Sequence, residues 1–188
     1  MREMRTERLL LRPFTVDDAP DCYREIYSDL DVVEHYSHLR FAGVAEVRDH
    51  IAGHVRAWAG QLGRHAVVRL TDGAFAGQVH LNPYVNADRW PGEPARPVNT
   101  VEVELAFAFG RRFWGHGYAQ EACRAVIGYC FDELRLPRLV GGAKRVNSRS
   151  IALQRRLGFT VHDIDGQPDG EYVVTVLNHP LTSGQVLA

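Results

Sequence analysis

The segment that most constrains the fold joins a strand-like run at 101–109 to a helix-like run at 119–134 through a Gly-x-Gly turn. It reads R-F-W-G-H-G-Y-A at 112–119. A turn of this kind gathers backbone N–H groups at a helix N-terminus, where they and the positive end of the helix dipole attract anions. Gly115 and Gly117 let a bare backbone approach phosphate oxygens and adopt positive φ. The segment therefore predicts a site for a nucleotide-like cofactor that carries a diphosphate.

Two other glycine motifs do not fit this segment. The dinucleotide fingerprint needs Gly or Ala three positions after the second glycine, in an early βαβ unit. Here Gln120 stands in that place, and the segment lies past the middle of the chain. The Walker A run G-x-x-x-x-G-K is absent from the sequence. An ordinary strand-to-helix turn also contains such glycines, so the turn alone leaves the cofactor open.

Three further motifs accompany the turn in a fixed order. The chain opens with T-E-R-L-L-L-R-P at 6–13, E-L-A-F-A-F stands at 104–109, and N-S-R-S at 147–150 precedes L-G-F at 157–159. Together with R-x-x-G-x-G, these motifs resemble the GNAT N-acetyltransferase superfamily and, within it, the RimJ/RimL-type branch. The resemblance covers roughly residues 6–177, and it implies acetyl-CoA as co-substrate. His35 and His38 are three positions apart without a third ligand nearby in the sequence, so no metal is expected.

The pattern of elements agrees with that resemblance. Alternation, helical spacing and turn residues predict the order β-α-α-β-β-β-α-β-α-β-β, which is a mixed α/β (α+β) fold with a central, mostly antiparallel sheet flanked by helices. We expect strands at 8–13, 65–70, 75–81, 101–109, 138–144, 159–164 and 171–177, and helices at 21–28, 46–62, 119–134 and 147–157. Residues 82–100 are rich in Pro, Gly and Asn and are expected to form a long functional loop.

Composition limits the classes of protein to consider. The chain has 188 residues, 45% hydrophobic and 24% charged, with a formal net charge of −1. This suits one domain with a substantial core, so we expect a single acetyltransferase domain over 1–188, with a core at about 6–178 and a flexible tail at 179–188. Without a basic block or a long apolar run, neither nucleic acid nor a membrane is an expected partner.

Cysteine usage and the N-terminus point to the cytoplasm. The first five residues are charged and lack the apolar region of a signal peptide. Cys22, Cys123 and Cys130 are an odd number without a C-x-x-C pair, which argues against a disulfide framework and against a zinc site. We expect packed, reduced thiols and a monomer or homodimer in the cytoplasm.

The resemblance also implies which residues hold acetyl-CoA. The backbone of the turn would meet the diphosphate, the strand before it would pair with the pantetheine arm, and Asn147 would contact a pantetheine amide. Arg112 could add a guanidinium, which binds phosphate bidentately. The expected cofactor-binding residues are Phe107, Ala108, Phe109, Arg112, Trp114, Gly115, His116, Gly117, Tyr118, Ala119, Asn147 and Ser150.

Glu104 is the expected catalytic base. Glu102 and Glu104 share one face of the predicted strand, since strand side chains alternate, and two carboxylates on an apolar strand need an explanation because buried charge is costly. We expect Glu104 to face the acceptor cleft and to take the proton of the amine directly or through water. The alternative, stronger for Glu102, is an exposed sheet face or an internal ion pair with an arginine.

Ser150 is the expected residue at the leaving thiolate, because its hydroxyl can donate a hydrogen bond to sulfur. Many GNAT enzymes instead carry a tyrosine four positions further on, where this chain has Gln154. By resemblance to the RimJ/RimL-like branch, the role then passes to Ser150. The other interpretations are a first-turn serine bonded to backbone for Ser150, and a simple N-cap for Asn147.

These observations together predict an acetyl-CoA-dependent N-acetyltransferase. The acceptor would be a primary amine, on a protein N-terminus or on a small molecule, and transfer would be direct, in a ternary complex, because no cysteine lies in a motif for an acyl-enzyme. The absent tyrosine supports one alternative, a non-catalytic acyl-CoA-binding or regulatory module with the same fold. Transfer of a longer acyl group is a third interpretation.

Overall fold

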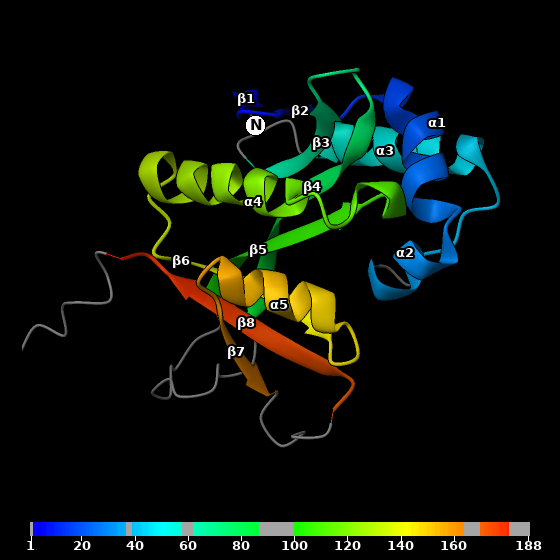
Figure 1. Ribbon diagram of the computed structural model, residues 1–188. Helices are drawn as coiled ribbons and strands as arrows, with labels where there is room; N and C mark the ends of the chain where they lie inside the picture. Colours follow the sequence, from blue (N-terminus) through cyan, green and yellow to red (C-terminus); the bar gives the residue numbers. More distant parts are fainter. Residues whose placement is uncertain (1, 37–38, 58–61, 87–99, 164–169, 181–188) are drawn as a thin grey trace, which may run out of the picture. The chain divides into compact units, whose positions relative to one another are not determined.

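The structure is a computed structural model that describes residues 2–36, 39–57, 62–86, 100–163 and 170–180. Its strands form one sheet in the order β1-β2-β3-β4-β5-β6-β8-β7 (Figure 1). Among the described ladders, β5 and β6 run parallel, and β1–β2, β2–β3, β3–β4, β6–β8 and β7–β8 are antiparallel. The expected mixed α/β fold with a mostly antiparallel sheet is therefore confirmed.

The chain divides into two compact units. Unit 1 contains Met1–Leu81 and Ala106–Val126, and unit 2 contains Asn82–Leu105 and Ile127–Ala188. Strand β4 (Phe75–Asn86) belongs to both units, as do strand β5 (Thr100–Phe109) and helix α4 (Tyr118–Gly128). The prediction of a single domain over 1–188 stays a prediction.

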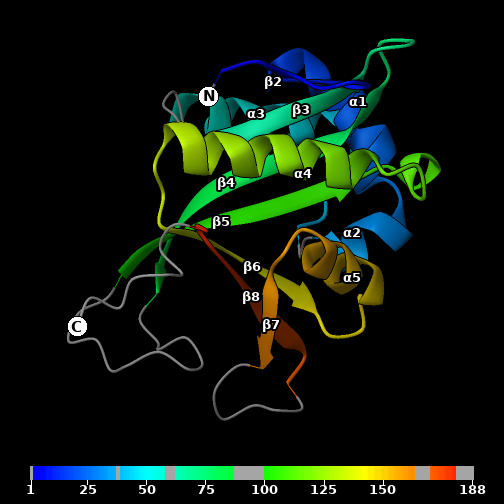
Figure 2. The ribbon, with the colours of Figure 1, turned by 60° about the vertical axis from the view of Figure 1, so that its left-hand side comes forward.

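Unit 1 is a sheet covered by helices on both faces. Helices α1 and α3 lie on one face of β2, β3 and β4, and α4 lies on the other (Figures 1 and 2). Strand β2 pairs with β3 from Leu9 opposite Arg69 to Pro13 opposite His65, and β3 pairs with β4 from Gly63 opposite Leu81, with a register shift between Val67 and Val68. Besides the shared elements, unit 1 contains β1 (Met4–Arg5), β2 (Leu9–Pro13), β3 (Gly63–Arg69), a 3-10 helix (Val16–Asp18), α1 (Ala19–Cys22), a π-helix (Tyr23–Tyr27), α2 (Leu30–Tyr36), α3 (Val44–Ala57) and a second 3-10 helix (Arg111–Phe113).

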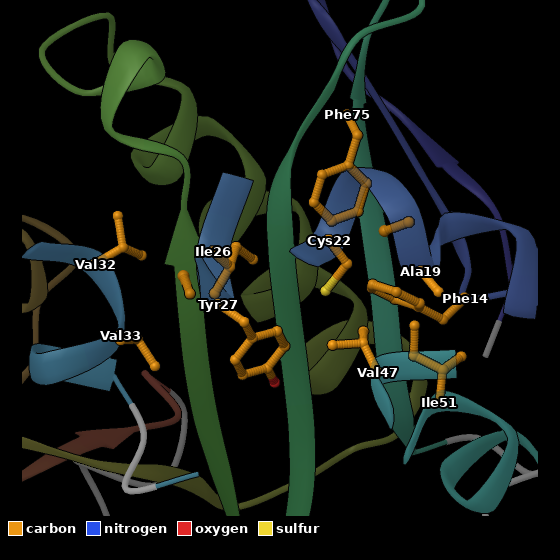
Figure 3. Packing of buried hydrophobic residues seen from close by; sticks show 12 residues of the cluster. Phe14, Ala19, Cys22, Ile26, Tyr27, Val32, Val33, Val47, Ile51 and Phe75 are labelled. Carbon is orange, nitrogen blue, oxygen red and sulfur yellow. The ribbon is translucent and has the colours of Figure 1, made fainter. Parts of the chain in front are cut away.

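The apolar core of unit 1 explains why α3 forms where it does. Val47 and Ile51 are four residues apart, so they lie on one face of the helix, and both are completely or almost completely buried. They pack with side chains of the short helices and of the sheet (Figure 3). The cluster consists of Phe14, Ala19, Cys22, Ile26, Tyr27, Val32, Val33, Val47, Ile51, Ala66, Phe75 and Ala108.

Unit 2 is built around β6 (Arg138–Lys144). This strand pairs with β8 (Tyr172–Asn178) along its full length, and β7 (Thr160–Asp163) pairs with the other side of β8. Val140 of β6 also pairs in parallel with Glu104 of β5. A π-helix (Tyr129–Glu133) follows α4, and α5 (Ser148–Arg156) begins after Asn147, whose side chain accepts a hydrogen bond from the backbone N–H of Ser150. The expected N-cap at Asn147 is confirmed.

The expected loop at 82–100 is wrong at both ends. Strand β4 continues to Asn86, and β5 already begins at Thr100. Pro and Asn lower strand propensity locally, but pairing between neighbouring strands overrides such preferences, and β4 neighbours β5 in the sheet. The rest of that loop, 87–99, lies outside the described residues, as do 58–61 of the second expected helix, 165–169 of the last turn, and 181–188 of the expected tail.

Candidate active site

The glycine turn lies entirely in unit 1, between β5 and α4. Gly115 and Gly117 have φ of 80° and 79°. The N–H groups of Phe113 and Trp114 bond to the carbonyls of Gly110 and Arg111, and the next N–H with a backbone acceptor among the described residues is that of Glu121, bonded to Gly117 O at 3.0 Å. The intervening N–H groups, at 115–120, have no such acceptor. Unpaired N–H groups beside a helix N-terminus, with alternating backbone hand, form a nest that suits an anion.

Conformation, rather than space, requires glycine at these two positions. A Cβ atom at Gly115 would meet nothing within 4 Å, and one at Gly117 would lie 3.4 Å from Nη2 of Arg8. A residue with a side chain would nevertheless be strained at such positive φ. The backbone of the turn therefore stays uncovered by its own side chains, which leaves the N–H groups accessible to an anion.

Arg8 and Glu121 tie β2 to the start of α4. The Glu121 carboxylate accepts hydrogen bonds from Thr6 Oγ1 at 2.6 Å, from the Arg8 backbone N–H at 2.8 Å and from Arg8 Nε at 2.7 Å. Arg8 Nη1 in turn donates to His116 O at 3.0 Å, and its guanidinium lies over the Tyr118 ring. Partial burial pushes the pKa of Glu121 upward, but these hydrogen bonds outweigh it and lower that pKa. Sequence reasoning missed Arg8 and Glu121, although the opening T-x-R-L motif contains Arg8.

Arg112 is held by a buried carboxylate. Its Nε and Nη2 donate to the two oxygens of Glu25 at 3.0 and 2.9 Å, and its guanidinium lies over the Phe113 ring. The neighbouring Gly110 is bare because a Cβ there would lie 2.7 Å from Glu25 Oε2. Two guanidinium nitrogens of Arg112 are thus engaged with Glu25. The phosphate contact expected of Arg112 stays a prediction.

The aromatic residues of the turn have different surroundings. Trp114 is half-buried, and its Nε1 donates to Phe109 O at 2.7 Å, which fastens the turn to the end of β5. His116 is exposed and stacks on Tyr118, with 5.7 Å between ring centroids. Phe107 is half-buried, whereas Phe109 is buried. None of the cofactor contacts expected at these residues is tested by the geometry.

The two carboxylates of β5 have different partners within unit 2. Glu102 is buried and bonded twice to Arg138, including Nε to Oε2 at 2.9 Å. Glu104 is partly exposed and accepts a hydrogen bond from Asn82 Nδ2 at 3.2 Å. Desolvation lowers the pKa of the Arg138 guanidinium. The internal ion pair expected as the alternative therefore holds for Glu102, and Glu104 remains the candidate base.

Asn147 and Ser150 are brought together at the start of α5. Asn147 Oδ1 accepts the Ser150 backbone N–H at 3.0 Å, and the Ser150 hydroxyl oxygen accepts a hydrogen bond from Gln154 Nε2 at 3.1 Å. Gln154 is buried, and Thr175 on β8 donates to its Oε1. The sequence marked Gln154 only as the place of a missing tyrosine, so these partners were not predicted.

Unit 1 also contains a polar cluster beneath its helices. Tyr36 Oη lies 3.0 Å from Nε2 of the buried His80 and accepts a hydrogen bond from Gln78 at 3.1 Å, and Arg64 Nη2 donates to His54 Nε2 at 3.0 Å. Burial, and then the nearby Arg64 charge, lower the pKa of His80. Arg64 Nε and Nη1 have no partner among the described residues. Arg64 and His80 stand opposite each other in the β3–β4 ladder, a cross-strand pairing that the sequence did not predict.

The three cysteines are free and buried, as expected. Burial raises the pKa of Cys22 and of Cys130 to about 12, and it raises the pKa of Cys123 as well. Thiols in such surroundings are poor nucleophiles, because the thiolate is the reactive form. No helix in the described parts of the chain has the length and apolar character needed to cross a bilayer.

The chain is similar to known acetyltransferases in sequence and in fold. The sequence model of a family described as "Acetyltransferase (GNAT) domain" matches residues 8–160. The chain is similar to an uncharacterized N-acetyltransferase, p20, of Bacillus licheniformis, with 29% identity over 85% of this chain and 83% of the relative. It is also similar to the FsC-acetyl coenzyme A-N(2)-transacetylase of Aspergillus fumigatus, with 31% identity over 50% of this chain and 37% of the relative. A GNAT-family acetyltransferase crystal structure from Bacillus anthracis shares the fold at 19% identity, with a TM-score of 0.72 over 95% of this chain and 99% of that one.

Proposed function

Since this chain belongs to the GNAT acetyltransferase family, we propose that it transfers the acetyl group of acetyl-CoA directly to a primary amine in a ternary complex. The observation that carries the proposal is the glycine turn. Its N–H groups at 115–120 lie before α4 with no backbone acceptor among the described residues, and two glycines with positive φ keep them uncovered. This arrangement fits the diphosphate of acetyl-CoA.

Within this proposal the turn residues from Arg112 to Ala119 hold the diphosphate, chiefly through backbone N–H groups. Phe107, Ala108 and Phe109 offer strand backbone to the pantetheine arm, and Asn147 offers its amide. Glu104 takes the proton that the amine loses, because an ammonium has no lone pair with which to attack. Its partial exposure and its neutral partner Asn82 support this role, since no guanidinium neutralises it within the described part of unit 2.

Direct transfer is proposed in preference to an acyl-enzyme. All three thiols are buried with raised pKa values, which leaves no reactive thiolate near neutral pH. Kinetics at varied concentrations of both substrates distinguishes the mechanisms. Intersecting double-reciprocal lines would support a ternary complex, and parallel lines would indicate a covalent intermediate.

The proposed acceptor is a primary amine in the cytoplasm, either a protein N-terminus or a small molecule. The resemblance to the RimJ/RimL-type branch supports the protein acceptor. The name of the Aspergillus fumigatus relative, FsC-acetyl coenzyme A-N(2)-transacetylase, supports transfer to a nitrogen and is compatible with either acceptor. A screen of amines and of peptides with free N-termini, followed by release of free thiol, would choose between them.

Calorimetric titration with acetyl-CoA tests the cofactor assignment. We expect selective binding of acetyl-CoA over NAD and ATP, and loss of binding in Gly117→Asp, because a carboxylate at that point repels phosphate and covers the N–H groups. Gly73→Asp is the matched control, because Gly73 also has positive φ, 70°, with nothing within 4 Å of its would-be Cβ, but lies in the β3–β4 turn. Equal affinity in both variants would refute the diphosphate assignment.

The alternative, a non-catalytic acyl-CoA-binding module, rests on Gln154 in the place where many relatives carry tyrosine. Both proposals predict binding of acetyl-CoA, so the amine screen separates them. Thiol release with at least one amine, lost in Glu104→Gln, supports the enzyme. Tight binding of acetyl-CoA without thiol release across the screen supports the module.

A further inference from the structure

Gln154 is a buried amide on α5 that is bonded at both ends. Only 3% of its surface is exposed. Its Oε1 accepts from the Thr175 hydroxyl, and its Nε2 donates to Ser150 Oγ at 3.1 Å and to Gly142 O at 3.4 Å. Leaving any of these groups unpaired away from water would cost free energy, so the amide is confined to a single orientation.

The partners also determine which way round the amide lies. A backbone carbonyl can only accept, so the atom that faces Gly142 has to be the NH2 group. The same NH2 group faces Ser150, whose hydroxyl oxygen is therefore the acceptor in that bond. The hydroxyl hydrogen of Ser150 must point away from Gln154, and among the described residues no other side chain or backbone carbonyl is bonded to it. Ser150 is thus held as a hydrogen-bond donor toward its surroundings.

Gly141 makes room for this arrangement next to β5. A Cβ atom at Gly141 would lie 2.8 Å from Thr175 Oγ1, 3.0 Å from Gln154 Oε1 and 3.4 Å from Leu105 O. The preceding residue of β6, Val140, is the parallel partner of Glu104. Within unit 2, the hydrogen bond between Gln154 and Thr175 therefore lies beside the part of β5 that contains Glu104.

We propose that Gln154 is a positioning residue which directs the Ser150 hydroxyl toward the sulfur of the leaving CoA. The inference rests on the proposed function, because acetyl-CoA supplies that sulfur. In the transfer step the amine nitrogen forms a bond to the acetyl carbon, the carbon–sulfur bond breaks, and its electron pair goes to sulfur. The ammonium proton has gone to Glu104 before the attack, the second proton that the nitrogen loses passes to solvent, and Ser150 keeps its proton while donating a hydrogen bond to the thiolate. A serine hydroxyl oriented by Gln154 would thereby take the role that the tyrosine phenol has in many GNAT enzymes.

The state of the bound thiol reports this hydrogen bond without any acceptor amine. Titration of CoA bound to the protein, followed by the ultraviolet absorbance of the thiolate, gives the pKa of the bound thiol. A donor aimed at sulfur favours the thiolate, so we expect that pKa to lie about 1 below that of free CoA, which corresponds to a hydrogen bond to a charged group.

Four proteins make the comparison: the wild type, Gln154→Met, Ser150→Ala and the double variant. Methionine keeps the volume of Gln154 without its polarity or a new charge, so Ser150 is free to turn toward a backbone carbonyl. We expect the bound-thiol pKa, measured at saturating CoA, to rise by about 1 in each single variant, with no further rise in the double variant. Thr175→Val, which removes the donor that fixes the amide, should give a smaller rise in the same direction.

The measured pKa values and CoA binding distinguish a failure of the Gln154 role from a failure of the proposed function. CoA binding with the same thiol pKa in the wild type and in Ser150→Ala would overturn this inference and leave the proposed function standing. A rise in Gln154→Met that persists undiminished when Ser150 is alanine would show that Gln154 acts independently of Ser150, which also overturns it. A folded wild-type protein that does not bind CoA would overturn the proposed function and this inference with it.

Discussion

Replacing Glu102 by glutamine should destabilise the protein strongly, because it leaves the charge of Arg138 without its buried counterion. The two side chains are 6% and 9% exposed, and two guanidinium nitrogens of Arg138 bond to the carboxylate, one of them at 2.9 Å. Glutamine keeps the shape of Glu102 but offers one neutral oxygen in place of two charged ones. The guanidinium stays protonated in spite of burial, since its intrinsic pKa is far above neutral.

The expected loss of unfolding free energy is about 3–5 kcal/mol, the range found when one partner of a buried ion pair is removed. For a chain of this length, each kcal/mol lowers the melting temperature by about 2–4 °C. Urea unfolding, followed by circular dichroism and by tryptophan fluorescence, measures the change. Glu104→Gln is the matched control, because it makes the same substitution two residues along the same strand on a partly exposed side chain; we expect it to cost less than about 1 kcal/mol.

A second variant removes both charges of the pair. Glu102→Leu combined with Arg138→Met should recover most of the lost stability, because apolar side chains of similar volume often replace a buried pair at little cost. If Glu102→Gln unfolds at the same urea concentration as Glu104→Gln, the pair does not stabilise unit 2, and the assignment of Glu102 to structure rather than chemistry fails.

Three further predictions concern catalysis, pH and packing. Glu104→Gln should lower turnover at least tenfold while calorimetry shows acetyl-CoA affinity nearly unchanged; equal losses would contradict its role as a base. Burial lowers the pKa of His65 to about 4, so His65 stays neutral in the folded state while in the unfolded state it takes up a proton near pH 6.5. The stability that neutral His65 contributes is therefore complete above pH 6.5, and up to about 3 kcal/mol of it is lost as the pH falls from 6.5 to 4. In urea titrations at several pH values, His65→Gln should make the stability less dependent on pH over that range. Gly77→Ala should lower the free energy of unfolding by about 1–3 kcal/mol, because the new Cβ would strike Ala108 O and lie 2.8 Å from Phe109 Cα. Gly53→Ala is the control: it lies in open space on α3 and should stabilise the protein by up to about 1 kcal/mol. Equal effects of the two substitutions on the melting temperature would count against the close approach of β4 and β5.

Local signals predicted the elements that carry the site. Strand β6 runs from Arg138 to Lys144 as expected, and α5 follows Asn147 because an asparagine there can accept the N–H of the residue three positions later. The turn at Gly115 and Gly117 was predicted from glycine chemistry alone, and both residues have the positive φ that this chemistry requires. For the cap and for the glycine turn, the determining interaction joins residues close in the chain.

The partners of the site residues could not be predicted, because they depend on pairing between distant segments. Arg112 meets Glu25 across 87 positions, and Glu102 meets Arg138 across 36. Gln154 reaches Thr175 only because β8 pairs with β6 in one particular register. A sequence pattern shows that arginines and carboxylates are available, but the choice of partner follows from the register of the sheet. A register shift of one residue would move every side chain of a strand to the opposite face.

The division of the chain into two units has a consequence for anyone who wishes to dissect it. Neither unit is one continuous stretch of sequence. Unit 1 consists of Met1–Leu81 and Ala106–Val126, and unit 2 consists of Asn82–Leu105 and Ile127–Ala188. A fragment that stops at Leu81 discards the glycine turn, and one that starts at Ile127 discards both strand carboxylates. A simple truncation therefore removes part of both units. Testing whether either unit folds by itself requires a circular permutation or a fusion of its two segments.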